Sequence, residues 1–134
     1  MDTPLVTVIL LTFNHINTFE KAINSVLEQK TNFPFQIIVY DDASTDGTSE
    51  IVKKYTDIPN VKAVIREENA HGKNLYLALK DVNTKYYAIL ETDDYWCDEN
   101  KLQTQVDILE NNPDCSFCAH NTLVNYVKTN KTKA

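Results

Sequence analysis

Four short apolar runs rich in β-branched residues alternate with stretches of helical periodicity. The runs span residues 5–11, 35–40, 61–65 and 86–90, and apolar residues recur at spacings of three and four after each run. Continuous apolar runs of this length are typical of strands buried on both faces, and the spacings indicate amphipathic helices. Strands that alternate with helices pair in parallel through right-handed crossovers. We therefore predict an α/β fold around a mostly parallel sheet.

Polar breaks between these segments set the expected ends of the helices. Asn17 with Glu20 three residues later is typical of a helix N-terminus, and Asp98 is expected to cap a helix that stops before Pro113. Residues 115–120 are a candidate fifth strand. Residues from about 121 to 134 lack apolar periodicity, so we expect a poorly defined tail there.

The size and charge of the chain limit its function. Its 134 residues, 43% hydrophobic and 24% charged, are typical of a globular protein, and one domain over residues 1–134 is expected. The net charge of −6 disfavours nucleic acid as a partner, because a phosphate backbone attracts a basic surface. No segment reaches the roughly 18 apolar residues of a membrane span. Three cysteines form no disulfide framework and favour a reducing, cytoplasmic setting.

Polar clusters follow three of the four predicted strands. Thr12-Phe13-Asn14 follows the first strand, Asp41-Asp42 follows the second, and Glu91 with Asp93-Asp94 follows the fourth. In an open parallel sheet, ligands bind beyond the carboxyl ends of the strands, where the loops and helix N-termini meet. We therefore expect these five carboxylates at one edge of the sheet.

Such a cluster of acids needs compensation. Neighbouring carboxylates raise one another's pKa unless hydrogen-bond donors or a cation stabilise them, and a divalent cation bound with a ligand is the simplest answer. Oxygen ligands without a neighbouring His or Cys favour Mg²⁺ or Mn²⁺, which usually take substrate phosphates as further ligands. A phosphorylated substrate is therefore expected. Phe13 offers a ring face for a nucleobase, and Asp42 can accept a hydrogen bond from a base N–H.

Other interpretations of the same residues stay open. The string over residues 41–47, Asp-Asp-x-Ser-x-Asp-Gly, is also typical of an ordinary turn followed by a helix cap. A phosphoacceptor receiver domain has a similar length and clustered acids, but it needs its acidic pair after the first strand, where this chain has Thr12-Phe13-Asn14. A non-catalytic nucleotide-binding module is a further alternative.

Taken in order, three strings resemble the inverting family 2 glycosyltransferases with the GT-A fold. They are Val6-Thr-Val-Ile-Leu-Leu-Thr-Phe-Asn14, Ile37-Ile-Val-Tyr-Asp-Asp-Ala-Ser-Thr-Asp-Gly-Thr48, and Leu90-Glu-Thr-Asp-Asp-Tyr-Trp96 followed by Lys101-Leu-Gln-Thr-Gln-Val106. The resemblance extends from about Pro4 to about Phe117. It implies a Rossmann-like three-layer sandwich that transfers a sugar from a nucleoside diphosphate, commonly a uridine one, to an acceptor saccharide or lipid-linked glycan.

The resemblance also implies roles for the matching residues. Asp42 would bind the base edge while Asp41 supports its loop. Asp93 and Asp94 would contact the ribose and hold Mn²⁺ or Mg²⁺ on the diphosphate, where the cation stabilises the departing charge. The nucleotide-binding residues implied in this way are Thr12, Phe13, Asn14, Asp41, Asp42 and Asp93. Lys73 completes the expected set as a substitute for a cation of the family that this chain lacks.

The sequence departs from the family pattern in three places. Glu91 stands where the first acid of the metal motif is usually Asp. The loop over residues 69–74 lacks the family's usual Arg, so Lys73 or Arg66 is expected to supply positive charge near the diphosphate. No acidic motif follows Asp114, although a general base must reach the proton that it removes. We therefore expect an N-terminal, donor-binding portion, truncated on its C-terminal side, that binds donor better than it turns over.

Two further features concern the C-terminal part and the setting. Cys115 and Cys118 lack a second pair for a zinc site, and on a strand their thiols would lie on opposite faces. Apolar surface on the last helix or strand would let two copies pair as a homodimer. The family resemblance implies cell-surface polysaccharide biosynthesis, peripheral to the inner face of a bacterial membrane.

Overall fold

The computed structural model describes residues 3–126 and 131–133. The chain divides into two compact units, Met1–Leu102 and Gln103–Ala134. The first unit contains a four-stranded sheet with three helices. The second contains most of a fourth helix and two short paired strands.

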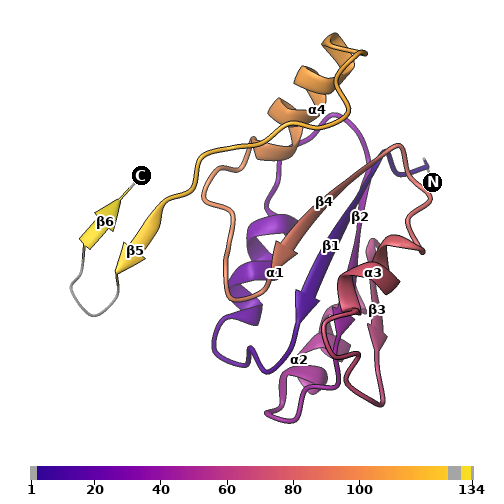
Figure 1. Ribbon diagram of the computed structural model, residues 1–134, viewed down its shortest axis with the longest axis vertical. Helices are drawn as coiled ribbons and strands as arrows, with labels where there is room; N and C mark the ends of the chain where they lie inside the picture. The colour runs from indigo at the N-terminus through magenta and orange to yellow at the C-terminus, as the bar shows by residue number, and fades with distance from the viewer. Residues whose placement is uncertain (1–2, 127–130, 134) are drawn as a thin grey trace. The chain divides into compact units, whose positions relative to one another are not determined.

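The first unit alternates strands and helices, as the sequence predicts. Its elements are β1 (Val6–Thr12), α1 (Phe19–Leu27), β2 (Phe35–Asp41), α2 (Thr48–Tyr55), β3 (Val61–Ile65), α3 (Asn74–Leu79) and β4 (Tyr86–Glu91). All strand pairs are parallel, and the order across the sheet is β3-β2-β1-β4 (Figure 1). The prediction of an α/β fold with a parallel sheet is confirmed.

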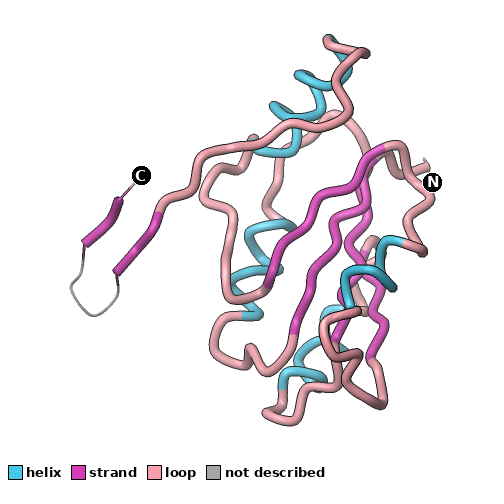
Figure 2. Tube along the Cα trace, viewed as in Figure 1, coloured by secondary structure: helices cyan, strands magenta, loops and turns pink. Residues whose placement is uncertain are grey.

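Helices lie on both faces of this sheet, which gives the expected three layers (Figure 2). On one face, Ala78 of α3 packs with Ile9, Ile38 and Tyr40. Successive side chains of a strand point to opposite faces, so the fully buried Leu10 faces the other way. Helices α1 and α2 lie there, against β1 and against β2 and β3 respectively. Burial on both faces explains the continuous apolar run of β1.

Strand β4 departs from the expectation of burial on both faces. It is an edge strand of the four-stranded sheet, and its exposure alternates along the strand. Tyr87 is 53% exposed and Ile89 is 40% exposed, whereas Leu90 is 5% exposed. The register aligns Ile89 with Ile9, so the exposed residues lie on the face that carries α3. Helix α3 has only six residues, and Ala78 packs against residues of the central strands β1 and β2. Tyr87 and Ile89 of β4 therefore stay exposed.

The second unit differs from the sequence prediction. Helix α4 (Lys101–Asn111) begins at the end of the first unit and stops where expected. Residues 115–120 are wrongly predicted as a strand, since they have no regular structure. An apolar run becomes a strand only when a neighbouring backbone pairs with it, and within the described residues none pairs with this run. The antiparallel strands there are β5 (Val124–Tyr126) and β6 (Lys131–Lys133).

Two other expectations concern this C-terminal part. Cys115 and Cys118 are free thiols, and Cys118 Sγ lies 3.8 Å from the carbonyl oxygen of Gln105. The expected tail over residues 121–134 contains both short strands, and its residues 127–130 and 134 lie outside the described residues. Among the residues described, no helix is long and apolar enough to cross a bilayer.

The start of α1 also corrects the sequence prediction. The helix begins at Phe19 with Thr18 at its N-cap, and no side chain caps it. The expected capping pair of Asn17 and Glu20 is therefore wrong. A capping pattern has low specificity, and here the chain enters the helix through a turn in which the backbone N–H groups of Thr18 and Phe19 donate to His15 O.

Candidate functional site

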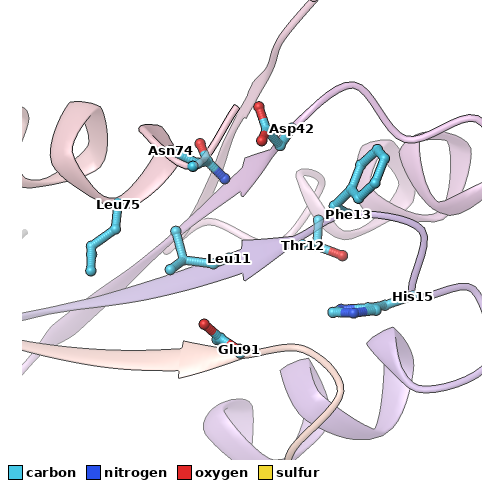
Figure 3. Close-up of a pocket in the computed structure, with 9 residues that line it drawn as sticks. Leu11, Thr12, Phe13, His15, Asp42, Asn74, Leu75 and Glu91 are labelled. Atoms are coloured by element: carbon cyan, nitrogen blue, oxygen red, sulfur yellow. The ribbon is translucent and has the colours of Figure 1, made fainter. Parts of the chain in front are cut away.

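A pocket of about 380 Å³ lies at the carboxyl edge of the sheet. It is lined from the ends of β1, β2 and β4 and from the start of α3 (Figure 3). Its lining residues are Leu11, Thr12, Phe13, His15, Asp42, Gly72, Asn74, Leu75 and Glu91. The register explains the gathering, because Leu11 aligns with Tyr40 on one side and with Glu91 on the other. The predicted meeting of these strand ends is confirmed.

Thr12 and Phe13 form part of the pocket wall. Thr12 is 2% exposed, and its Oγ1 has no hydrogen-bond partner among the described residues. A buried hydroxyl without a partner costs about 1–3 kcal/mol, so a ligand that completes the bond recovers that free energy. Phe13 is 45% exposed and leaves a ring available beside the pocket. Both residues suit a planar, polar-edged ligand.

Asn14 ties the loop after β1 to the loop after β2. Its backbone N–H donates to Ser44 Oγ at 2.9 Å, and its Oδ1 accepts from the backbone N–H of Thr45 at 2.7 Å. The Asn14 backbone is left-handed, with φ of 54°, a conformation that Asn tolerates better than most residues. Asn14 is exposed and does not line the pocket. It therefore shapes the wall rather than forming it.

A second link between these two loops runs through Asp46. Its Oδ2 accepts from the backbone N–H of Ile16 at 3.1 Å, and its Oδ1 accepts from the backbone N–H of Thr48 at 3.0 Å. The hydroxyl of Thr48 also donates to Oδ1, and this bond contributes most to a pKa of Asp46 below its ordinary value. The carboxylate is therefore held in its charged form.

Asp41 lies inside the loop rather than in the pocket. Its side chain is fully buried; Oδ1 accepts from the backbone N–H of Ser44 at 3.0 Å, and Oδ2 accepts from the hydroxyl of Ser49. These donors satisfy the carboxylate without a cation. The contacts agree with the support role that the resemblance implies for Asp41.

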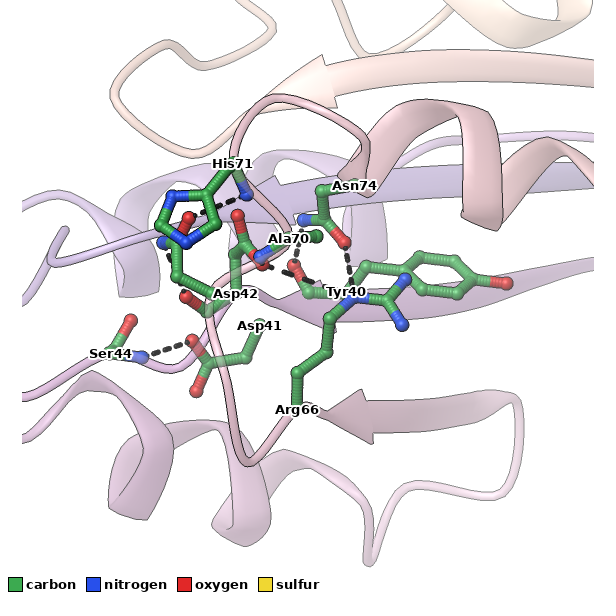
Figure 4. Close-up of polar contacts among 9 residues, drawn as sticks. Tyr40, Asp41, Asp42, Ser44, Arg66, Ala70, His71 and Asn74 are labelled. Carbon is green, nitrogen blue, oxygen red and sulfur yellow. Dashed lines mark hydrogen bonds and ion pairs between the residues drawn. The ribbon is translucent and has the colours of Figure 1, made fainter.

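Asp42 is the acid that reaches the pocket. It is 7% exposed, and Oδ1 accepts from the backbone N–H of Ala70 at 2.6 Å (Figure 4). Arg66 Nε lies 4.0 Å from the same oxygen. Asn69 Nδ2 donates to the backbone carbonyl of Asp42 at 2.9 Å. Among the described residues, no hydrogen bond reaches Oδ2, which leaves one carboxylate oxygen for a ligand.

The loop before α3 is organised around Arg66 and Asn74. Arg66 Nε donates to Asn74 Oδ1 at 2.9 Å, and Asn74 Nδ2 donates to the carbonyl oxygen of Tyr40 at 3.1 Å. Arg66 is therefore held beside Asp42, where it compensates a buried carboxylate. Lys73 is exposed and does not line the pocket. Of the two cations expected near a diphosphate, Arg66 is engaged elsewhere and Lys73 stays a candidate.

Tyr40 carries a polar contact beneath this loop. Its hydroxyl donates to Asp81 Oδ2 at 3.1 Å. Burial raises the pKa of Tyr40 to about 12, and the hydrogen bond and negative charge of Asp81 act in the same direction. The phenol therefore stays protonated and keeps its donor role over the whole neutral range.

Three exposed acids lie at the end of β4 and in the turn after it, namely Glu91, Asp93 and Asp94. Glu91 lines the pocket, and its carbonyl oxygen accepts from the backbone N–H of Asp94 at 3.0 Å. No hydrogen bond or ion pair satisfies the carboxylates of Asp93 and Asp94 within the described part of the chain. Asp93 and Asp94 are therefore available to an external cation or donor.

The five expected carboxylates thus differ in environment. Asp41 and Asp42 are buried and held by donors, so a cation is not needed there, whereas the acids after β4 are exposed. Residues 3–126 and 131–133 contain no group of three His, Cys, Asp or Glu side chains poised around one ion. Asp93 and Asp94 fit Mn²⁺ or Mg²⁺ as a pair, because such ions use one or two protein carboxylates together with substrate phosphates.

Two polar side chains that line this pocket, those of His15 and Asn74, were not assigned to the site from the sequence. Asn74 begins α3, and His15 lies just after the β1 loop, with Nδ1 2.9 Å from Thr92 Oγ1. Neither belongs to an acidic string, so only the spatial arrangement brings them to the site. His15 could have been found from the sequence, because it is a polar residue close to the end of a predicted strand.

The sequence matches the family described as Glycosyl transferase family 2 over residues 7–134. It is 35% identical over 118 residues to the putative teichuronic acid biosynthesis glycosyltransferase TuaG of Bacillus subtilis, a match that covers 85% of this chain and 45% of TuaG. Three mycobacterial relatives match over 35% of their own length. The chain therefore spans less than half the length of these curated relatives.

Solved structures agree with this match. S. aureus TarS 1–349 in complex with UDP superposes with a TM-score of 0.69 and 30% identity, over 79% of this chain and 32% of that one. The mannosyltransferase PcManGT from Pyrobaculum calidifontis, in complex with GDP-Man and Mn²⁺, gives a TM-score of 0.66 and 30% identity over the same shares, 79% and 32%. The likeness to TarS confirms the Rossmann-like GT-A fold that the resemblance implied.

Proposed function

The chain belongs to glycosyl transferase family 2, and from this membership and its pocket we propose that it carries the donor-binding half of a glycosyltransferase. The donor would be a nucleoside-diphosphate sugar, with uridine as the favoured nucleoside. The observation that carries the proposal is a pocket at the sheet edge lined by both Thr12 and Asp42. Within the described residues, the buried Thr12 Oγ1 has no hydrogen-bond partner, and no hydrogen bond reaches Asp42 Oδ2.

The nucleobase would occupy the space between the ends of β1 and β2. Phe13 would stack on the base, since an aromatic ring suits a planar ligand. Asp42 would accept the N–H of the base, and Thr12 would complete its hydrogen bonding there. Asn14 and Asp41 would keep these loops in place. The UDP in the TarS complex supports uridine, and the GDP-Man in the PcManGT complex makes guanosine the nucleotide to test against it.

The diphosphate would lie toward the turn after β4. Asp93 would face the ribose side, and Asp93 and Asp94 would hold Mn²⁺ or Mg²⁺. When bound, the cation supplies Lewis-acid stabilisation of the charge that develops on the leaving diphosphate. Lys73, exposed at the start of α3, would reach toward the same charge. The neighbour PcManGT, which is in complex with Mn²⁺, supports the choice of metal.

An inverting transfer also needs a general base near the acceptor hydroxyl. Among the described residues, the exposed acids at the end of β4 and in the turn after it are Glu91, Asp93 and Asp94, and the proposal assigns Asp93 and Asp94 to the donor. Because the chain spans less than half of its relatives, we propose that the acceptor-binding part and the general base lie in sequence corresponding to the remainder of those relatives. The chain alone would then bind donor with little turnover.

The proposed acceptor is a saccharide or a lipid-linked glycan. Support comes from two relatives, TuaG, whose name concerns teichuronic acid biosynthesis, and TarS, which is named as a poly(ribitol-phosphate) β-N-acetylglucosaminyltransferase. Synthesis in the cytoplasm, peripheral to the inner face of a bacterial membrane, and self-association into a homodimer belong to the same proposal. Sedimentation of the isolated chain as a single monomeric species would contradict the proposed homodimer.

The alternative is a non-catalytic nucleotide-binding module, since every residue that the proposal uses is assigned to the nucleotide or its metal. A receiver domain is disfavoured, since the acidic pair lies at the end of β2 and Thr12-Phe13-Asn14 lies at the end of β1. Backbone amide NMR of the labelled chain tests the site itself. Adding UDP with Mg²⁺ should shift the signals of Phe13, Asp42 and Gly72 and leave Tyr55 unchanged. Shifts confined to α2, or none at all, would contradict the proposed site.

A further inference from the structure

We propose that His15 is a positioning residue that holds the turn carrying Asp93 and Asp94 against the loop that would bind the base. The expected effect on nucleotide binding rests on the proposed function, whereas the contact between the two loops is independent of it. It joins two loops that are 77 residues apart in the sequence through His15 Nδ1 and Thr92 Oγ1, at 2.9 Å.

Thr92 is a fixed point of the turn. It is fully buried, and its backbone N–H donates to the carbonyl oxygen of Leu11 at 3.0 Å. In the described part of the chain, His15 is the hydrogen-bond partner of its hydroxyl. If the imidazole is removed, that hydroxyl becomes a buried polar group without a partner. The resulting cost in free energy destabilises the present position of the turn.

The acids beyond Thr92 depend on this anchor. The next fixed point along the chain is Trp96, whose backbone N–H donates to Ser25 Oγ at 3.0 Å. Between the two anchors, the Asp93 and Asp94 side chains make no hydrogen bond within the described residues. Their placement follows from the backbone, so a shift at Thr92 moves both carboxylates.

The contact does not depend on one protonation state of the ring. A threonine hydroxyl both donates and accepts, so it can donate to a neutral Nδ1 or accept from a protonated one. The test is therefore a change of side chain rather than a change of pH. Asn places an amide atom near the position of Nδ1, so His15→Asn can keep the bond that His15→Ala removes.

Hydrogen exchange of the chain without nucleotide tests the anchor directly. We expect His15→Ala to speed amide exchange at Thr92 and Asp94, whose N–H groups donate to Leu11 O and Glu91 O, by about threefold to tenfold, the range for loss of one hydrogen bond. Strand β2 should keep its rate, and His15→Asn should restore most of the protection. His120→Ala is the matched control, because His120 is exposed and bonds only to Asn121 among the described residues. Unchanged exchange in the turn, or an equal rise in β2, would overturn the inference.

Titration with UDP tests the consequence. In Mn²⁺, His15→Ala should lose about threefold to tenfold in affinity, and in EDTA less than about twofold, because the base contacts remain. Thr92→Val, which removes the hydroxyl, should give the same pattern, and the double variant should lose no more than either single one. Equal losses in Mn²⁺ and EDTA, or additive losses, would overturn the positioning role. If the wild-type chain binds no nucleotide, the proposed function fails, and the exchange experiment still decides whether His15 holds the turn.

Discussion

Asp42 Oδ1 accepts a hydrogen bond from the backbone N–H of Ala70 at 2.6 Å, which fixes the loop before α3 to the end of β2. The same carboxylate therefore organises one wall of the pocket and keeps its second oxygen open. Arg66, 4.0 Å away, compensates its charge in a partly buried setting. One residue thus serves both the shape of the site and its proposed contact with the base.

The first prediction concerns this dual role. Asp42→Ala should lower nucleotide affinity by about tenfold or more, with or without metal, because a charged hydrogen bond is lost and the Ala70 N–H loses its partner. Calorimetric titration with UDP in Mn²⁺ and in EDTA measures both values. Asp57→Ala, at an exposed position, is the control. A loss seen only in Mn²⁺ would contradict the assignment of Asp42 to the base.

The second prediction separates the metal-binding acids from the base-binding one. Asp94→Ala should weaken UDP binding chiefly in Mn²⁺, because its carboxylate would act through the cation. Asp114→Ala, which removes another exposed acid, should leave binding unchanged in both conditions. The same titrations give the answer. Identical affinities for Asp94→Ala and the wild type in Mn²⁺ would remove Asp94 from the site.

The third prediction uses the unpartnered hydroxyl of Thr12. Thr12→Val has nearly the same shape and lacks the buried hydroxyl, so the free energy of unfolding should stay equal or rise by up to about 1 kcal/mol. Nucleotide affinity should fall about threefold, since the ligand loses a hydrogen bond. Urea unfolding and UDP titration measure the two effects. A less stable variant with unchanged affinity would indicate that the hydroxyl serves the fold alone.

The fourth prediction concerns alkaline pH. The pKa of Tyr40 in the folded chain is raised from 10.0 to about 12, so its contribution to stability is complete below about pH 10 and is lost as the pH rises toward 12. Tyr40→Phe should remove this part of the pH dependence. It should also cost about 1 kcal/mol at pH 8, through loss of the bond to Asp81. Urea unfolding between pH 8 and about 11 measures the difference between the variants. Tyr76→Phe, at an exposed tyrosine, should keep the wild-type slope, and parallel wild-type and Tyr40→Phe curves would contradict the assignment.

The sequence predicted the sheet well because burial on both faces leaves a continuous apolar run, as in β1. The strand ends followed from the polar residues that stop these runs, so the meeting of Thr12, Asp42 and Glu91 at one edge was also predictable. The alternating exposure of β4 was not, because it depends on which strand lies at the edge of the sheet.

The contacts that give each acid its own environment could not be predicted from the sequence. Asp41 and Asp42 are adjacent, yet one turns into its own loop and the other meets Ala70, 28 residues later. The contact of His15 with Thr92 has an even longer separation. Such pairs depend on how the loops fold back over the strand ends. Residues 115–120 were predicted as a strand from their composition alone. Composition does not supply a neighbouring strand to pair with, so the prediction failed.

The most direct test of the central claim is calorimetric titration of the wild-type chain with UDP, in Mn²⁺ and then in EDTA, with GDP as the competing nucleotide. Binding of UDP that weakens without metal, together with weaker binding of GDP, is the predicted result. Absence of binding to UDP, GDP, CDP and dTDP in Mn²⁺ would contradict the proposal that this chain carries a donor site.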